Sequence, residues 1–146
     1  MIALLLALAA EPAVQEALAP SPSQSPIVVR DTAMIVSGLQ APFEANIRVV
    51  IENTGTGPDE VVSVSTPLGE TLEFRTDGNM FSRQAPVALP IPVPVRTDAR
   101  PIYLPLVIRV DGLENGDYWS TGVPITVRFA HAGERVLTAK QVTPAR

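Results

Sequence analysis

Apolar and polar residues alternate over most of the chain from residue 27 onward, which is the pattern of half-buried β-strands. Each alternating run is short and ends at a cluster of turn-forming residues, such as NTGTGP or the Asp77-Gly78 pair. The last two runs flank a short turn at residues 131–134, so they predict a β-hairpin. The predicted strands cover Ile27–Val36 (as one strand or a strand pair), Asn46–Glu52, Asp59–Ser65, Thr71–Arg75, Ile102–Val110, Val123–Ala130 and Arg135–Val142.

Seven or eight short strands, spaced roughly 10 to 15 residues apart, predict an all-β fold built as one antiparallel sandwich or barrel. The 15 prolines and 9 glycines lie mostly between or inside these runs, which favours strands and turns over helices. A length of 146 residues allows one domain, which we place at residues 27–143.

The chain opens with MIALLLALAA, a short apolar run that ends in an A-x-A-like cleavage motif at Ala7-Leu8-Ala9. Residues 1–10 therefore predict a signal peptide, too short to span a bilayer as a helix, and a periplasmic or secreted mature protein. The run contains no Lys or Arg, so a mis-assigned start or a short anchoring stub stays open as the alternative. Residues 11–26 are rich in Pro, Ala and Ser and predict an extended linker.

Prolines alternate with apolar residues in VALPIPVPV, residues 87–95. Pro90, Pro92 and Pro94 share one parity, so three successive positions on one edge of a strand lack an N–H donor. Such a strand can pair only through its other edge, and we therefore predict a protected edge strand. A polyproline recognition segment is the alternative interpretation.

The composition excludes several classes of function. The net charge is −4 and the pI is about 4.9, so binding to nucleic acid is not expected. The absence of cysteine excludes disulfides, thiolate nucleophiles and thiolate metal sites. His131 is the only histidine and no G-x-S-x-G motif is present, so we expect no hydrolase triad and no enzyme activity.

Several segments, taken in their order, resemble the PCu(A)C family of periplasmic copper chaperones. The resemblance covers roughly residues 27–142. It implies a single cupredoxin-like β-sandwich, export to the periplasm, and carriage of Cu(I) toward an oxidase partner or into periplasmic copper storage. The matching residues are Ile51–Gly55, Asp59–Val62, Val64–Pro67, Leu72–Phe74, Gly112-Leu113, Gly122–Pro124, Phe129 and Ala132-Gly133.

The same resemblance implies a copper site of two His and two Met, a ligand set that suits Cu(I). In this chain the first histidine position is Arg75, and the two ligand positions before Gly112-Leu113 are Val107 and Arg109. Met80 is the candidate for the methionine of the intervening loop. Arginine is a fixed cation without a lone pair to donate. We therefore expect a degenerate site that binds copper weakly or not at all.

Met80 and His131 are the remaining weak candidates for a rebuilt metal site. His131 is expected to be a solvent-exposed turn residue, and Met34, in an apolar strand, a core residue. The acidic segment DGLENGD, residues 111–117, is interpreted as a solvated turn rather than a Ca²⁺ site.

Arg75 and Arg109 are expected at one end of the sandwich as solvated residues that form salt bridges, for example with Asp77 or Asp111. The alternative is that they bind an anion or an acidic partner.

Tyr118 and Trp119 are candidate partner-binding residues, or else they cap the open end of the sandwich. Two hypotheses follow. The first is an exported copper-chaperone-like protein that acts in periplasmic copper homeostasis or oxidase copper delivery. The second is a metal-free periplasmic interaction module that works through Arg75 and Arg109 or through Tyr118 and Trp119.

Overall fold

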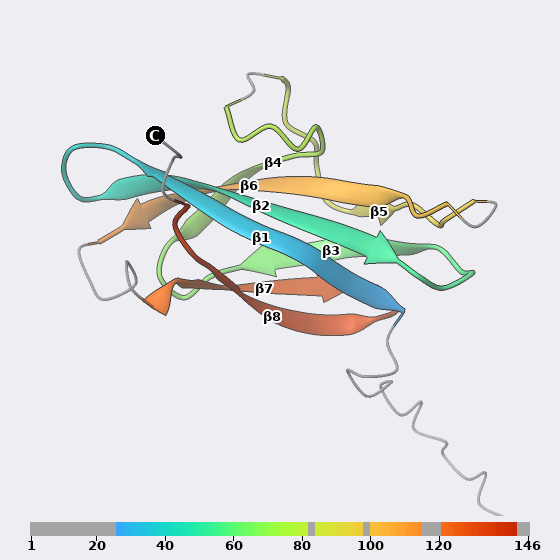
Figure 1. The fold of residues 1–146 in the computed structure, drawn as a ribbon. Coiled ribbons are helices and arrows are strands. Elements are labelled where there is room, and N and C mark those ends of the chain that lie inside the picture. Colours follow the sequence, from blue (N-terminus) through green and yellow to red (C-terminus); the bar gives the residue numbers. More distant parts are fainter. Residues whose placement is uncertain (1–25, 82–83, 98–99, 115–120, 143–146) are drawn as a thin grey trace, which may run out of the picture.

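The structure is a computed structural model, and it describes residues 26–81, 84–97, 100–114 and 121–142. Figure 1 shows its strands stacked in two layers. The all-β prediction is confirmed, and the fold is a single antiparallel β-sandwich. The eight described strands are β1 (Ile27–Ser37), β2 (Phe43–Asn53), β3 (Asp59–Ser65), β4 (Glu70–Arg75), β5 (Ile91–Val93), β6 (Tyr103–Leu113), β7 (Val123–Phe129) and β8 (Gly133–Ala139).

The two sheets have four strands each. Sheet A has the order β1-β2-β6-β4, and sheet B has the order β5-β3-β7-β8. The ladders between neighbouring strands are all antiparallel. Figure 1 shows the connection between β4 and β5 arching over sheet A on the side away from sheet B.

The core lies between the sheets and takes alternate residues from each strand, because successive side chains of a strand point to opposite faces. In β2, Ile47 and Val49 are 0% exposed and lie opposite Ile108 and Leu106 of β6. Burial of each such side chain contributes about 1.5–3 kcal/mol. Met34 belongs to this core, as predicted, and is fully buried. The other parity of β2, β4 and β6 forms the outer face of sheet A.

Strand β6 is longer than the sequence predicts. It continues through Asp111 and Gly112 to Leu113, where the expected turn would have ended it. Gly112 has a φ of +81°, and the register with β2 shifts between Phe43 and Ala45. This bulge inserts an extra residue, so Leu113 points back into the core. The Asp-Gly pair therefore marks a bulge inside the strand rather than its end.

Residues 87–95, which we call the proline segment, form an edge element as predicted, but only Ile91–Val93 is a strand. This strand, β5, pairs with β3 on one side only. Its two apolar residues are buried and Pro92 is exposed. The predicted protection of an edge is therefore confirmed over a shorter length.

The ends of the proline segment reach sheet A. The N–H of Val87 donates to the carbonyl of Phe74 in β4 at 2.7 Å. At the other end, Val95 forms a parallel bridge with Asn53 at the end of β2. The segment thus pairs with strands of both sheets.

Asp59, at the start of β3, fixes the turn between β7 and β8. One carboxylate oxygen accepts from the backbone N–H groups of Glu60 at 2.8 Å and His131 at 2.9 Å, and the other accepts from Ala132 at 2.9 Å. Asp59 is only 7% exposed. Its buried charge is therefore satisfied by backbone donors from two separate parts of the chain.

The predicted signal peptide and linker lie outside the described residues, apart from Pro26. Strand β1 begins at Ile27. In the part of the chain that the structure describes, no helix has the length and apolar character needed to cross a bilayer.

Candidate functional site

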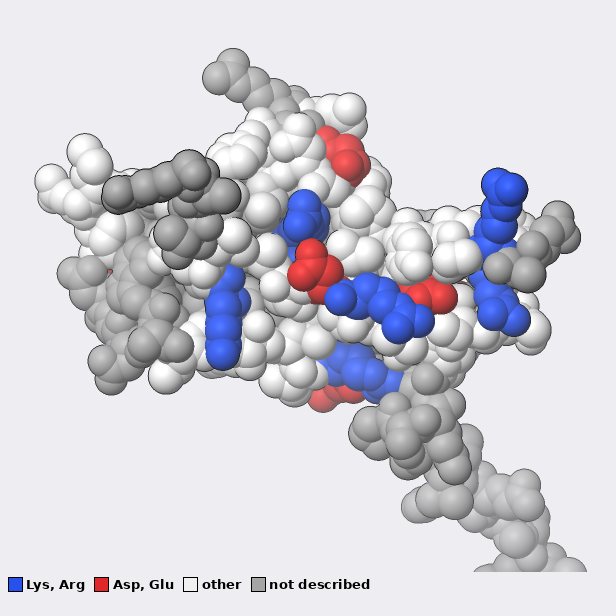
Figure 2. All heavy atoms as spheres, viewed as in Figure 1, with Lys and Arg blue, Asp and Glu red and all other residues white. Residues whose placement is uncertain are grey.

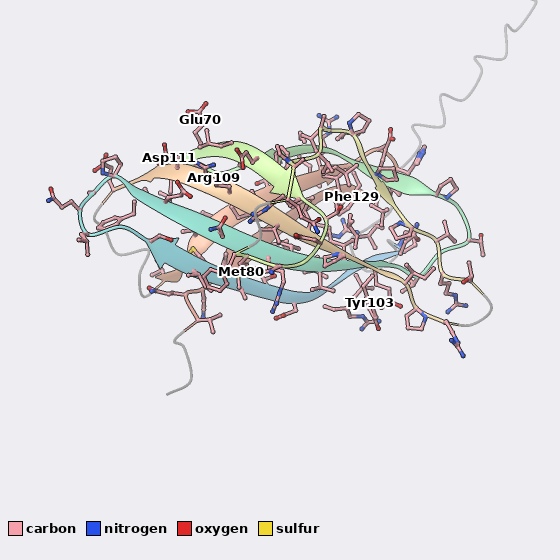
Figure 3. All side chains as sticks on the ribbon, turned by 90° about the horizontal axis from the view of Figure 1, so that it is seen from above. Glu70, Met80, Tyr103, Arg109, Asp111 and Phe129 are labelled. Atoms are coloured by element: carbon pink, nitrogen blue, oxygen red, sulfur yellow. The ribbon has the colours of Figure 1, made fainter. Side chains whose placement is uncertain are left out.

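The outer face of sheet A brings together the residues that the sequence singled out. Arg75 of β4 lies directly opposite Val107 of β6 in the ladder. Arg109, two residues further along β6, lies between Glu73 of β4 and Asn46 of β2. Figure 3, seen from above this face, shows Arg109 and Tyr103 towards opposite ends of β6 and Met80 between them.

These residues surround a hollow of about 460 Å³ between the sheet and the β4–β5 connection. The expectation that Arg75 and Arg109 lie at one end of the sandwich is therefore wrong, because the alternation of the strands places them on the outer face of sheet A. The lining residues are Glu44, Asn46, Glu73, Arg75, Met80, Phe81, Gln84, Ala85, Pro86 and Arg109.

Arg109 is held between two carboxylates from the strands on either side. Its Nε lies 3.0 Å from Glu44 Oε1, and its Nη1 lies 3.1 Å from Glu73 Oε1. The Nε–H is not aligned with the Glu44 oxygen, so that contact is an ion pair without a hydrogen bond. The salt-bridge alternative is thus realised for Arg109, but its partners are Glu44 and Glu73 rather than the suggested Asp77 or Asp111.

The two carboxylates stabilise the charged form of Arg109. The negative charge of Glu44 is the main cause that raises the pKa of Arg109 above its ordinary value, and the charge of Glu73 adds to it. Partial burial works in the opposite direction. Arg109 is therefore a cation at every pH at which the protein is studied.

Arg75 is built into the wall of the hollow. It is only 9% exposed, and its Nη2 donates to the backbone carbonyl of Met80 at 3.3 Å. This bond ties β4 to the connection that arches above it. Val107 beside it is 1% exposed although it points away from the core, so the floor of the hollow is covered at this point.

The β4–β5 connection is fixed above sheet A by a close contact and by local hydrogen bonds. Gly78 has a φ of +73°, and a Cβ added there would lie 2.8 Å from Cβ of Pro105 in β6. The side chain of Asp77 accepts from the N–H of Asn79, and that of Asn79 accepts from the N–H of Phe81. These successive turns hold Met80 at the rim of the hollow.

The rest of this outer face also carries ion pairs. Arg48 of β2 lies 3.2 Å from Asp31 of β1, and Arg30 donates to Glu52. The hydrogen bond to Glu52 is the main cause that raises the pKa of Arg30. Figure 2 shows acidic and basic side chains in adjoining positions across the face in view.

His131 does not take part in the hollow. It lies in the turn between β7 and β8, on sheet B, and borders a separate depression with Pro58, Asp59 and Glu60. Its side chain is exposed, as the sequence predicts for a turn histidine. The two weak metal candidates, Met80 and His131, therefore lie at different hollows.

The residues of the hollow do not fit Cu(I). Met80 provides one thioether, whereas Arg75, Val107 and Arg109 provide no lone pair. Carboxylates are hard ligands and poor ones for Cu(I), and the two that line the hollow already pair with Arg109. Among the described residues, no group of three or more His, Cys, Asp and Glu side chains is arranged to hold a metal ion.

Sequence reasoning missed the two residues that complete the cluster, Glu44 and Asn46. Glu44 precedes the predicted second strand, which in fact begins at Phe43. The alternation that places Asn46 and Arg48 on the outer face could have been extended back by two residues to find it. Tyr118 and Trp119 lie outside the described residues, as does part of the DGLENGD segment.

Among the comparisons with known proteins, the one with solved structures gives matches. No family model and no curated protein matches the chain. Among solved structures, it is similar to the apo PCuAC domain from PmoF1, with 20% identity, 82% of this chain and 95% of that chain covered, and a TM-score of 0.61. It is also similar to the copper-bound PCuAC domain from PmoF2, with 14% identity, 82% and 94% covered, and a TM-score of 0.60.

The apo form of that PmoF2 domain aligns as well, at 15% identity over 83% of this chain and 93% of that chain, with a TM-score of 0.54. At such low identity these likenesses establish the fold alone. The chain has the cupredoxin-like β-sandwich of PCuAC domains.

Proposed function

We propose that this protein is an exported binding module with a copper-chaperone-like fold. It takes part in periplasmic copper homeostasis or oxidase copper delivery through a protein partner, and it binds Cu(I) weakly or not at all. It acts by binding and not as an enzyme. The observation that carries the proposal is the hollow on sheet A. Three of the four positions that the family resemblance assigns to copper ligands, Arg75, Met80 and Arg109, line it, and Val107 lies opposite Arg75 in the ladder.

The ion pairs of Arg109 support the loss of the metal. A cation that bridges carboxylates from β2 and β4 occupies the place where a soft ligand would be needed. Arg75 adds a second positive charge nearby. Neither arginine has a lone pair to offer Cu(I), so the hollow is suited to polar contacts with another molecule.

A titration with Cu(I) in competition with a chelator of known affinity tests the proposal. The mature protein is compared with Met80→Ala and His131→Ala. We expect the protein to lose copper to a weak chelator and both variants to behave as the unmodified protein does. Tight one-to-one binding that either substitution removes would show that the site has been rebuilt, and the proposal would fail.

The second candidate function is a metal-free periplasmic module without any role in copper biology. It is favoured by the two ion pairs of Arg109, whose carboxylate partners have no soft-ligand character. Deletion of the gene in its host separates the two candidates. A changed sensitivity to copper or a loss of oxidase activity supports the first candidate, and unchanged copper handling supports the second.

A further inference from the structure

The hollow on sheet A offers free acceptor oxygens. Arg109 contacts one oxygen of Glu44 and one oxygen of Glu73. Among the described residues, no hydrogen bond or ion pair involves the second oxygen of either carboxylate, and the two side chains are 38% and 39% exposed. Asn46, which also lines the hollow, has an Oδ1 without a hydrogen-bond partner among the described residues.

The two arginines of the hollow are, by contrast, already engaged. Arg75 is buried and donates to the Met80 carbonyl. Arg109 lies between two carboxylates, so an incoming anion would have to displace at least one of them against its own repulsion. The cluster of Arg109, Glu44 and Glu73 carries one net negative charge, which is offset by Arg75 in the wall of the hollow. The whole chain carries −4.

The wall opposite these charges is apolar. Met80, Phe81 and Pro86 line it, and Phe81 is 74% exposed. An exposed aromatic ring attracts a cation over its face, and a guanidinium group also stacks on such a ring. A polar floor with free acceptors and an aromatic wall together suit a basic group on an aliphatic stem.

We propose that this hollow binds the guanidinium or ammonium group of a basic side chain that a protein partner presents. The proposal rests on the proposed function, in which the hollow is an interaction surface, and it names the partner's chemistry. A guanidinium has five donors, which is enough to bridge the free oxygens of Glu44 and Glu73 while Arg109 stays in place.

A neighbouring groove favours a polypeptide over a free small cation. A groove of about 450 Å³ lies between the start of β6 and the proline segment, and its lining includes Pro105, which Gly78 of the β4–β5 connection approaches closely. Its lining is mostly apolar and includes Val87, Pro92 and Tyr103, the last of which is 46% exposed. Apolar residues on the same extended partner segment can lie in this groove while the basic side chain occupies the hollow.

Binding of short peptides to the mature protein tests the proposal. The probes are acetylated and amidated pentapeptides of alanine with a central arginine, citrulline or glutamate, and free arginine amide is the small-molecule control. Amide chemical shifts in NMR spectra report both the location and the strength of binding. We expect the arginine peptide to bind with a Kd of about 1 mM or tighter and to shift the amides of Glu73 and Arg109. The citrulline peptide is expected to bind at least about fivefold more weakly.

Two substitutions should have opposite effects on binding of the arginine peptide. Glu73→Gln should weaken binding of the arginine peptide about fivefold or more, because a charge-assisted acceptor is lost. Arg109→Gln should tighten it about threefold or more, because the internal competitor for both carboxylates is removed. Glu134→Gln, at an exposed position of β8, is the control for Glu73→Gln. It changes the net charge by the same amount and should leave binding unchanged. Thermal unfolding of each variant shows that it is folded.

Binding of the glutamate peptide would overturn the proposal and show an anion site. Weaker binding of the arginine peptide in Arg109→Gln would also overturn it, because removal of a competing cation should not weaken binding at a cation site. Absence of binding by any peptide would overturn it as well. Binding of arginine amide as tightly as the arginine peptide would contradict the inference that the partner is a polypeptide. None of these results changes the Cu(I) titration, so the failure of this inference and the failure of the proposed function are distinguishable.

Discussion

Two groups of carboxylates in this protein are held in opposite ways. Asp59 is buried, and all of its described hydrogen bonds come from backbone N–H groups. Glu44 and Glu73 are more than a third exposed, and among the described residues their ion pairs are with the side chain of Arg109 alone. Asp59 therefore stabilises the backbone of the fold directly. The ion pairs of Arg109 join only side chains, and the backbone hydrogen bonds of the sheet do not depend on them.

This difference shows at which positions side chains can be substituted without a change of fold. Backbone N–H donors are present whatever the side chain, except at proline, so a carboxylate that satisfies them is constrained. Side chains on the outer face of sheet A have no such constraint, because the ladder beneath them is formed by backbone groups alone. The same strands can therefore carry either a soft-metal site or an ion-pair cluster, depending on which side chains their outer face holds.

The largest effect is expected from restoring soft ligands to the hollow. The triple substitution Arg75→His, Val107→His and Arg109→Met, together with Met80, provides the two His and two Met that the family resemblance implies. We expect the affinity for Cu(I) to rise by about a thousandfold or more, since four soft or borderline ligands replace one. Competition with a Cu(I) chelator measures it. A triple variant that is folded but still loses copper to a weak chelator would show that the ligand positions have been assigned wrongly.

Removal of the Asp59 carboxylate should have the next largest effect. Asp59→Ala leaves three backbone N–H groups without their acceptor, so we expect a loss of about 2–4 kcal/mol of unfolding free energy. Asp59→Asn keeps one acceptor and should cost less. Chemical denaturation measures both. A loss below about 0.5 kcal/mol for Asp59→Ala would remove the contrast between the two groups of carboxylates.

Substitution of Gly78 should have an intermediate effect. A side chain there meets Pro105 and is strained at a φ of +73°, so we expect Gly78→Ala to cost about 1–2 kcal/mol. The β4–β5 connection should move away from β6, and the amide signals of Met80 and Phe81 should shift. The matched control is Gly57→Ala, where an added Cβ meets nothing within 4 Å.

The smallest effect on stability is expected from Arg109. Its side chain is 35% exposed, so the loss of both ion pairs in Arg109→Gln should change the unfolding free energy by less than about 1 kcal/mol. Denaturation at low and high salt checks the electrostatic origin, because screening should reduce even this small difference. A cost close to that of Asp59→Ala would mean that the cluster is structural.

The sequence predicts the layers of this fold better than the borders of its strands. Alternation in Asn46–Glu52 and Val123–Phe129 assigns the correct face to each residue, because one face of each strand has to be buried. The bulge at Gly112 and the short length of β5 depend on how strands from distant parts of the chain meet, and a local pattern does not contain this information.

The candidate site was predictable in part for the same reason. Arg75 and Arg109 stand out because the resemblance places ligands there, and the ladder confirms that β4 and β6 are neighbours. Glu44 comes from a third strand, whose pairing with β6 spans more than 50 residues of sequence. No spacing motif links it to Arg109, so its role becomes visible only when the sheet is assembled.

The proline segment also has a consequence for the kinetics of folding. Until residues 87–95 dock, β3 is the outermost strand of sheet B, and its backbone groups are open to strands of other chains. The docked segment closes this edge by pairing with Asp59–Val61, and its first residue, Val87, also bonds to Phe74 in the other sheet. Once docked, it presents prolines to neighbouring molecules, so two copies can pair by mistake through this edge only before docking.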